Sequence, residues 1–189
     1  MKKILEEIYQ VDPYTQYANK TKFDLKKVGE PLYGELTQKG TNMIIEYFKE
    51  YFNEDTVFYD LGSGLGKMVL HIGIQCKIKK SIGIEYSKER HQGAIDLQEK
   101  YAKGYNNISF LNKPLQEQDI SDATIVYMDD TAYPDEILNQ VYDKLPIGCL
   151  LIFKKRLFPS HPLYSEQITV QNGTDRTYKQ SNFSFLIKK

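Results

Sequence analysis

Cysteine is scarce in this sequence, and its charges balance. The 189 residues contain two cysteines, Cys76 and Cys149, which lie in apolar segments without C-x-x-C spacing. We therefore expect buried thiols, with neither a metal site nor a disulfide framework. The 25 basic and 25 acidic side chains cancel, so the strongly basic balance that is typical of nucleic-acid and membrane-surface binders is missing.

Long apolar stretches are missing as well. Residues 1–10 begin with Lys2 and Lys3 and continue with Glu6 and Glu7, which leaves no apolar stretch long enough for a signal peptide or a membrane span. We expect an intracellular, soluble protein with no membrane partner. A chain of 189 residues has the size of one domain and buries roughly 70% of its unfolded surface.

Helix-like and strand-like segments alternate between about residues 40 and 155, which favours a parallel sheet in an α/β fold. Residues 1–40 combine a short amphipathic helix with a polar arm, which we interpret as a lid, or as an embellishment packed on the sheet, of the main domain, residues 41–189. Near the C-terminus, Asn172-Gly173 is a hairpin signal between two strand-like segments. An antiparallel β-hairpin is therefore expected to complete the sheet.

Five short apolar segments predict the parallel strands: Thr56–Asp60, Ser81–Glu85, Ile108–Leu111, Thr124–Met128 and Gly148–Phe153. Ahead of the first strand, apolar residues at helical spacing predict a helix over Thr41–Phe52. These residues are Met43, Ile44, Tyr47, Phe48 and Tyr51. We expect them to pack the helix against the strand that follows.

A glycine-rich turn follows the first predicted strand, with the sequence Asp60-Leu-Gly62-Ser-Gly64-Leu-Gly66. Glycines in such a turn permit positive φ angles and let a ligand approach the backbone closely. The spacing excludes a phosphate-binding P-loop, because Leu61 stands where its first glycine belongs and Met68 replaces its magnesium-binding hydroxyl. The dinucleotide pattern G-x-G-x-x-G fits poorly, since Lys67 occupies the position of its last glycine.

The turn resembles the E/D-x-G-x-G-x-G turn of the class I methyltransferases. This resemblance implies S-adenosyl-L-methionine as the cofactor and S-adenosyl-L-homocysteine as the product. The carboxylate at the end of the strand, here Asp60, would face the cationic amino-acid end of that cofactor. A glycine-rich turn without any ligand is the alternative.

A second carboxylate ends the next predicted strand. Glu85 lies 25 residues after Asp60, close to the offset at which nucleotide-binding α/β folds place an acid on the ribose hydroxyls. A carboxylate suits this position because it accepts two hydrogen bonds from a vicinal diol. We predict ribose binding by Glu85. The alternative is that Glu85 caps the helix that begins near Ser87.

Three groups of residues together resemble the Dot-one-like (disruptor of telomeric silencing) family of non-SET histone-lysine methyltransferases. They are Tyr33-Gly34-Glu35, Tyr59 to Gly66, and Gly83-Ile84-Glu85. The resemblance covers most of the chain after about residue 28, and it implies a Rossmann-like, seven-stranded class I sheet with helices on both faces. It also implies that the cofactor is bound by Tyr33, Glu35, Asp60, Gly62, Gly64, Gly66 and Glu85.

The loop with Tyr33-Gly34-Glu35 is the most discriminating part of this resemblance. In the family it closes over the cofactor, and its Glu contacts the methionine end; from the residues alone, a turn that leads into a helix is an equal alternative. Similar enzymes have an acid after the third strand, where this chain has Asn112. We expect Asn112 to hydrogen-bond the adenine amine, with Pro114 or Leu115 as an apolar wall.

The acceptor is expected beyond the fourth strand, because ligands of open α/β sheets bind outside the carboxyl ends of the strands. Asp129 and Asp130 lie there and depart from the Asn-rich segment of the family. A carboxylate pair attracts a lysine ammonium and assists its deprotonation, and Tyr133 is expected to wall the channel. The alternative is that residues 129–131 cap the helix that begins near Pro134.

The absence of two motifs argues against DNA bases as the methyl acceptor. The sequence has neither the N-P-P-Y of adenine-N6 enzymes nor the Pro-Cys of cytosine-5 enzymes. The resemblance favours a histone, a nucleosome or another protein as the partner. Lys154, Lys155 and Arg156, with Lys26 and Lys27, are candidates for phosphate contact, or else they form a solvated face.

We therefore predict an S-adenosylmethionine-dependent protein-lysine methyltransferase. A histone substrate would place it in the nucleus or on chromatin, and another substrate in the cytoplasm. Two rivals stay open: a class I methyltransferase that acts on RNA or a small molecule, and a cofactor-binding module without catalysis.

Overall fold

The computed structural model describes residues 1–17, 33–154, 166–174 and 177–189. The predicted arm over residues 18–32, with Lys26 and Lys27, lies outside the described residues, as do Lys155 and Arg156. Within the described ranges, no helix is long and apolar enough to cross a membrane.

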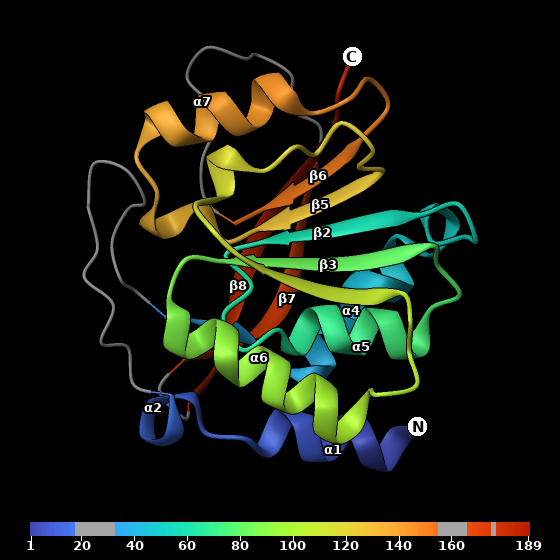
Figure 1. Ribbon diagram of the computed structural model, residues 1–189. Coiled ribbons are helices and arrows are strands. Elements are labelled where there is room, and N and C mark those ends of the chain that lie inside the picture. Colours follow the sequence, from blue (N-terminus) through green and yellow to red (C-terminus); the bar gives the residue numbers. More distant parts are fainter. Residues whose placement is uncertain (18–32, 155–165, 175–176) are drawn as a thin grey trace.

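The described chain forms an eight-stranded sheet with helices on both sides, shown in Figure 1. The strands are β1 (Glu35–Leu36), β2 (Val57–Leu61), β3 (Lys80–Glu85), β4 (Ile108–Asn112), β5 (Ile125–Met128), β6 (Leu150–Phe153), β7 (Glu166–Thr174) and β8 (Thr177–Ile187). The helices are α1 (Lys2–Gln10), α2 (Pro13–Gln16), α4 (Gln38–Tyr47), α5 (Lys67–Gln75), α6 (Lys88–Tyr101) and α7 (Asp135–Lys144). Short 3₁₀ turns are η1 (Lys49–Tyr51), η2 (Leu115–Glu117) and η3 (Asp130–Ala132).

The strand order across the sheet is β1-β7-β8-β6-β5-β2-β3-β4. Strands β2 to β6 are parallel, whereas β7 and β8 are antiparallel to their neighbours. The predicted α/β fold, the five parallel strands and the closing hairpin are confirmed. The sheet exceeds the expected seven strands by one, because the two-residue β1 adds to the edge of β7.

The central strand β2 is buried over its whole length, as expected for a parallel strand that is covered on both faces. Alternate residues serve opposite sides. Phe58 packs in the core cluster of one face, and Val57 and Tyr59 pack in the cluster of the other. This alternation follows from the two-residue period of a strand.

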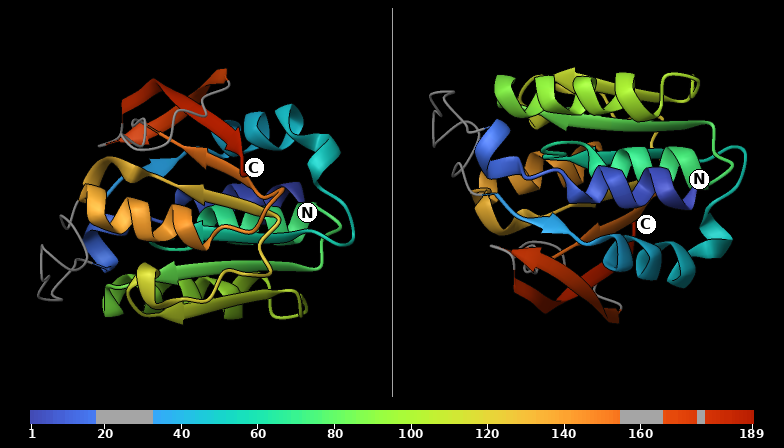
Figure 2. Two further views of the ribbon diagram at one scale, coloured as in Figure 1. Left: turned by 90° about the horizontal axis from the view of Figure 1, so that it is seen from above. Right: turned by 90° about the horizontal axis from the view of Figure 1, so that it is seen from below.

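Helices α1, α4, α5 and α6 cover one face of the sheet, and α7 with η2 covers the other (Figure 2). The N-terminal helix α1 belongs to the first layer, where Leu5 and Ile8 are buried. A polar network also joins this layer. The hydroxyl of Tyr9 contacts Thr41 Oγ1 at 2.8 Å and His71 Nδ1 at 3.0 Å. His71 is fully buried and therefore structural.

The helix predicted over Thr41–Phe52 begins and ends earlier than expected. Helix α4 spans Gln38–Tyr47, and Thr37 caps its start by accepting from Gly40 N. Ile44 and Phe48 are buried as predicted. The predicted burial of Met43, Tyr47 and Tyr51 is wrong, since these side chains are exposed. The rings of Tyr47 and Tyr51 nevertheless lie edge-on against the buried ring of Phe48.

The hairpin forms, but its predicted turn is wrong. Asn172 pairs with Lys179 and Gly173 with Tyr178, so both residues lie inside β7, which continues to Thr174. Their other edge pairs with β1. This second partner gives Asn172-Gly173 a place within the sheet, which overrides the local turn preference.

Candidate functional site

A cavity of about 280 Å³ opens at the carboxyl edge of the sheet, where β2, β3, β5 and β6 end. Most of the residues predicted to bind cofactor or acceptor line it: Tyr33, Glu35, Asp60, Gly62, Gly64, Glu85, Asp129 and Tyr133. Three predicted residues do not: Gly66, Asn112 and Asp130. The structure thus brings together side chains that lie up to 100 residues apart in the sequence, from Tyr33 to Tyr133.

The glycine-rich turn is shaped by contacts that leave no room for a side chain. Gly62 has φ +92°, and a Cβ there would lie 2.4 Å from the Tyr133 hydroxyl oxygen. Gly64 has φ +55°, and its Cβ would lie 2.7 Å from the ring of Tyr33. Both positions therefore require glycine. Gly66, at φ +70°, precedes α5 and packs against Phe110, so it serves helix–sheet packing.

Glu85 joins the glycine-rich turn to the next helix. Its Oε2 accepts a hydrogen bond from Gly64 N at 2.9 Å, and its Oε1 accepts from Ser87 N at 2.7 Å. Ser87 in turn caps α6 by accepting from Arg90 N. Burial raises the pKa of Glu85, while backbone hydrogen bonds from Ser87, Gly64 and Tyr86 and the charge of Arg90 oppose the rise. The carboxylate therefore supports the helix start, as the alternative held, and also lines the cavity.

Asp60 is a buried carboxylate one residue before the end of β2, close enough to Glu85 to feel its charge. It is 4% exposed. Burial first, and then the charges of Glu85 and Asp129, raise the pKa of Asp60 from 3.8 to about 8. A buried acid with two acidic neighbours is costly to ionise unless a cation compensates it. The site is therefore suited to a ligand that brings a positive charge to Asp60.

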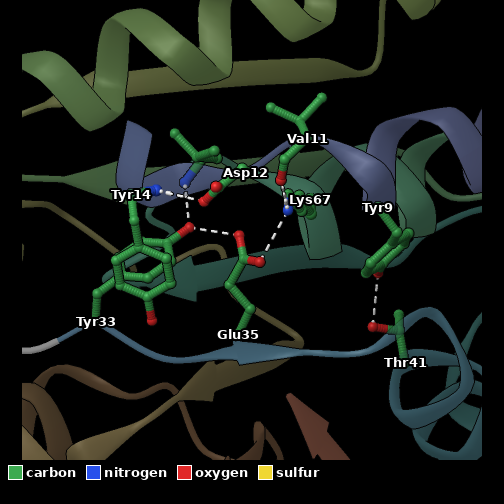
Figure 3. A network of polar contacts seen from close by, with 9 residues as sticks. Tyr9, Val11, Asp12, Tyr14, Tyr33, Glu35, Thr41 and Lys67 are labelled. Atoms are coloured by element: carbon green, nitrogen blue, oxygen red, sulfur yellow. Dashed lines mark hydrogen bonds and ion pairs between the residues drawn. The ribbon is translucent and has the colours of Figure 1, made fainter. Parts of the chain in front are cut away.

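The loop with Tyr33 and Glu35 is tied down by a polar network (Figure 3). Tyr33 Oη donates to Glu35 Oε1 at 2.5 Å, and Leu65 N donates to Tyr33 Oη at 3.4 Å. Lys67 Nζ donates to Glu35 Oε2 at 2.8 Å and to Val11 O at 2.7 Å. Both oxygens of Glu35 are thereby engaged, and the loop continues into the sheet as β1.

Two cations of the site were missed by the sequence analysis. Lys67 is 5% exposed although it follows the glycine-rich turn directly. The Arg90 guanidinium lies 4.6 Å from the centre of the Tyr33 ring, in a cation–π contact. Both residues line the cavity. One local signal could have identified Lys67, which stands at the start of an otherwise apolar, buried helix. Because a lysine is rarely buried unless it is paired, this position indicates an acidic partner elsewhere in the chain.

Asn112 lies at the end of β4 beside the cavity. Its amide donates to the backbone oxygens of Glu85 at 2.8 Å and of Tyr86 at 3.0 Å. These bonds join the carboxyl ends of β3 and β4. Pro114 and Leu115 line the cavity, in agreement with an apolar wall there.

The two adjacent acids after β5 have different surroundings. Asp129 lines the cavity and forms an ion pair with Lys154 Nζ at 2.8 Å. It also caps η3 by accepting from Thr131 N at 3.2 Å. Asp130 is fully buried, and it accepts from Lys154 N at 3.0 Å. Helix α7 itself has no side-chain cap, so the capping alternative holds for the 3₁₀ turn and not for that helix.

Tyr133 lines the cavity beside the glycine-rich turn. Its hydroxyl lies against Gly62, and burial followed by the charges of Glu85 and Asp60 raises its pKa. The phenol is therefore neutral at physiological pH and able to donate a hydrogen bond. In the described part of the chain, no group of three His, Cys, Asp or Glu side chains has the arrangement of a metal site.

Comparison with known proteins gives related sequences. The family model described as "Histone methylation protein DOT1" matches residues 14–181. A histone-lysine N-methyltransferase, H3 lysine-79 specific, from Caenorhabditis elegans is 26% identical over 125 residues, which cover 60% of this chain and 13% of the relative. A protein-lysine N-methyltransferase from Saccharolobus islandicus (strain REY15A) is 30% identical over 92 residues, which cover 49% of this chain and 56% of that relative.

The fold also matches solved structures. An RNA methyltransferase from Salinibacter ruber, solved in complex with S-adenosyl-L-homocysteine, superposes with a TM-score of 0.63. The match has 19% identity and covers 80% of this chain and 92% of that one. This structural match establishes the shared fold, while the match to the family model establishes family membership. Because that model matches most of the 189 residues, the chain belongs to the DOT1 family of histone methylation proteins.

Proposed function

We propose that this protein is an S-adenosylmethionine-dependent protein-lysine methyltransferase. The observation that carries the proposal is the pair of buried carboxylates, Asp60 and Glu85, at the ends of adjacent strands with the glycine-rich turn between them. Family membership and the names of the relatives support it. The chain spans 13% and 56% of those two relatives.

The residues present fit the cofactor. Asp60 suits the ammonium of the methionine end, because a cation there would offset the cost of a buried charge. Glu85 accepts from three backbone donors, those of Gly64, Ser87 and Tyr86, and a carboxylate offers about four acceptor positions, so acceptor capacity is left for the ribose diol. Ser63 Oγ is buried at the cavity and has no hydrogen-bond partner in the described chain, so a bound ligand would satisfy it.

The cofactor would supply an electrophilic methyl group on a cationic sulfur. The protein's own residues provide binding, orientation and exclusion of water. We assign the cofactor to Tyr33, Glu35, Asp60, Gly62, Gly64 and Glu85, with Gly66 and Asn112 supporting the turn and the strand ends. Asp129 and Tyr133 are assigned to the acceptor, and buried Asp130 positions the segment that holds them.

The acceptor class follows the relatives, which are named as lysine methyltransferases of histone H3 and of protein. We propose a protein lysine, in a histone or another protein, as the acceptor. A histone substrate would place the enzyme on chromatin. We also propose that, within residues 1–40, the loop with Tyr33 and Glu35 closes the cavity over the cofactor, while α1 belongs to the core layer of residues 41–189.

The test is transfer of labelled methyl from S-adenosylmethionine to nucleosomes, free histones, total RNA and a cell extract. Asp60→Ala serves as the inactive control, and Lys80→Met, far from the cavity, as the active one. Label on protein lysine that disappears with Asp60→Ala is the expected result. Label on RNA alone would overturn the acceptor class, and cofactor binding without any label would favour a binding module.

A further inference from the structure

The acceptor side of the cavity already contains an ammonium group. Asp129 follows β5 and Lys154 follows β6, and these parallel strands pair Met128 with Phe153. The two residues are therefore next in register at the carboxyl edge of the sheet. Both line the cavity together with Tyr133, and Lys154 Nζ lies 2.8 Å from Asp129 Oδ2.

Lys154 is fixed by its backbone, and among the described residues its ammonium has one hydrogen-bond partner, Asp129. Its backbone N donates to Asp130 Oδ1 at 3.0 Å, and Asp130 is fully buried. Its ammonium donates to Asp129 Oδ2. Since a lysine side chain has four rotatable bonds, the ammonium can leave Asp129 while the backbone stays in place.

Asp129 is oriented so that one oxygen serves an ammonium. Its Oδ1 accepts from Thr131 N at 3.2 Å and from Thr131 Oγ1 at 2.5 Å. Its Oδ2 is left for Lys154. A second ammonium at the same oxygen would lie beside the first, and like charges repel strongly at such a distance.

The ion pair between Lys154 and Asp129 has features that allow another ammonium to replace that of Lys154. The side chains of Lys154 and Asp129 are 19% and 31% exposed, so solvent partly screens their attraction and the pair stabilises the fold less than a fully buried pair does. When another ammonium replaces that of Lys154, the charge beside Asp129 stays the same. A neutral acceptor cannot make this exchange.

We propose that Lys154 is an internal occupant of the acceptor position, and that an incoming lysine ammonium binds Asp129 by displacing it. This inference rests on the proposed function, since it takes the acceptor to be an amine. Lys154 then sets the affinity for the acceptor and favours cationic amines over neutral acceptors. It acts through Asp129 and takes no part in the methyl transfer itself.

The experiment is a titration with n-butylammonium, a mimic of the lysine side chain, followed by calorimetry. The proteins are the wild type, Lys154→Met, Lys154→Met combined with Asp129→Asn, and Lys80→Met. Lys80 pairs with Asp122 at 2.9 Å at the opposite edge of the sheet, so its variant loses a comparable ion pair far from the cavity. We expect Lys154→Met to bind butylammonium at least tenfold more tightly than wild type, and the double variant to lose that gain. Equal affinity for wild type and Lys154→Met would overturn the proposal.

A second measurement needs no substitution of the tested protein. In protein with ¹³C-labelled lysine, the Lys154 side-chain resonance, assigned with Lys154→Arg, should move toward that of a solvated lysine as butylammonium saturates the wild type. An unmoved resonance at saturation would overturn the proposal even if Lys154→Met failed to fold. S-adenosyl-L-homocysteine is titrated into the same samples. Failure of that ligand to bind would contradict the proposed function and leave the amine result standing.

Discussion

Two lysine–carboxylate pairs face the same cavity with the same N–O distance and different surroundings. Lys67 and Glu35 lie 2.8 Å apart on the cofactor side, with side chains 5% and 21% exposed. Lys154 and Asp129 are also 2.8 Å apart, and their side chains are 19% and 31% exposed. Distance alone therefore does not tell what an ion pair does. Burial and additional partners decide whether it holds the fold or yields to a ligand.

The more buried pair, Lys67 with Glu35, is called the inner pair, and Lys154 with Asp129 the outer pair. Both members of the inner pair have further hydrogen-bond partners, as expected of a contact that holds the fold together. Lys67 also donates to Val11 O, and Glu35 also accepts from Tyr33. Three separate segments, from α1, β1 and α5, thus meet at one ammonium (Figure 3). The outer pair joins only two neighbouring strand ends. The proposed cofactor side is therefore preorganised, whereas the proposed acceptor side keeps the contact that we propose to be exchangeable.

The largest expected effect is a loss of stability when the inner pair is broken. Lys67→Met leaves Glu35 without its cation and Val11 O without its donor, and we expect it to lower the free energy of unfolding by about 3 kcal/mol, near the low end for a broken buried pair. Urea unfolding measures this change. Adding Glu35→Leu should recover part of the loss, since no buried charge is then left unpaired. A loss no larger than that of Lys154→Met would contradict the contrast between the two pairs.

Glu85→Ala is expected to have the next largest effect, on cofactor affinity. It removes the charge-assisted contact to the ribose and frees Gly64 N and Ser87 N, so binding of S-adenosyl-L-homocysteine should weaken by about 2–3 kcal/mol. Calorimetry measures the affinity. Glu85→Gln keeps an acceptor for one of the backbone donors and should lose less. Wild-type affinity in both variants would remove Glu85 from the cofactor site.

Asp60→Asn should separate stability from binding. The pKa of Asp60 is about 8 in the folded protein and 3.8 as its ordinary value, so the folded state binds the proton more tightly and its stability falls as pH rises from 4 to 8. The variant should thus unfold at a higher temperature than the ligand-free wild type at pH 8, and at the same temperature near pH 3.5. Its affinity for S-adenosyl-L-homocysteine should fall about tenfold. Thermal unfolding at both pH values with calorimetry tests this, and a destabilised variant at pH 8 would contradict it.

Binding by the wild type should also depend on pH. A cationic ligand favours the ionised form of Asp60, so affinity should rise between pH 6 and 7.5 as the free protein's carboxyl gives up its proton more readily. The rise should be absent in Asp60→Asn.

The sequence predicted those parts of the site that depend on local patterns. The five parallel strands, the glycine-rich turn and the offset between Asp60 and Glu85 all follow from residues close together in the chain. The structure places these two acids at neighbouring strand ends, as that offset indicated. Such features could be predicted because strand period, turn chemistry and βαβ length are local properties.

The parts that escaped prediction depend on distant partners. Lys67 is buried because Glu35, 32 residues away, neutralises it. Asp129 and Asp130 look alike in sequence, yet one faces the cavity and the other is fully buried beneath Lys154. The predicted turn at Asn172-Gly173 failed because β1 pairs with that segment. No local pattern encodes any of these long-range contacts.

The smallest expected effect concerns the outer pair. Lys154→Met should lower the free energy of unfolding by about 1 kcal/mol or less, because solvent partly screens the pair and the backbone bond from Lys154 to Asp130 survives the substitution. Lys80→Met, which removes a pair with side chains 47% and 46% exposed, is the matched control and should behave alike. Urea unfolding of both variants beside Lys67→Met orders the three pairs by burial. If Lys154→Met instead lost as much stability as Lys67→Met, the outer pair would be structural, and an incoming amine would have to overcome that stability to reach Asp129.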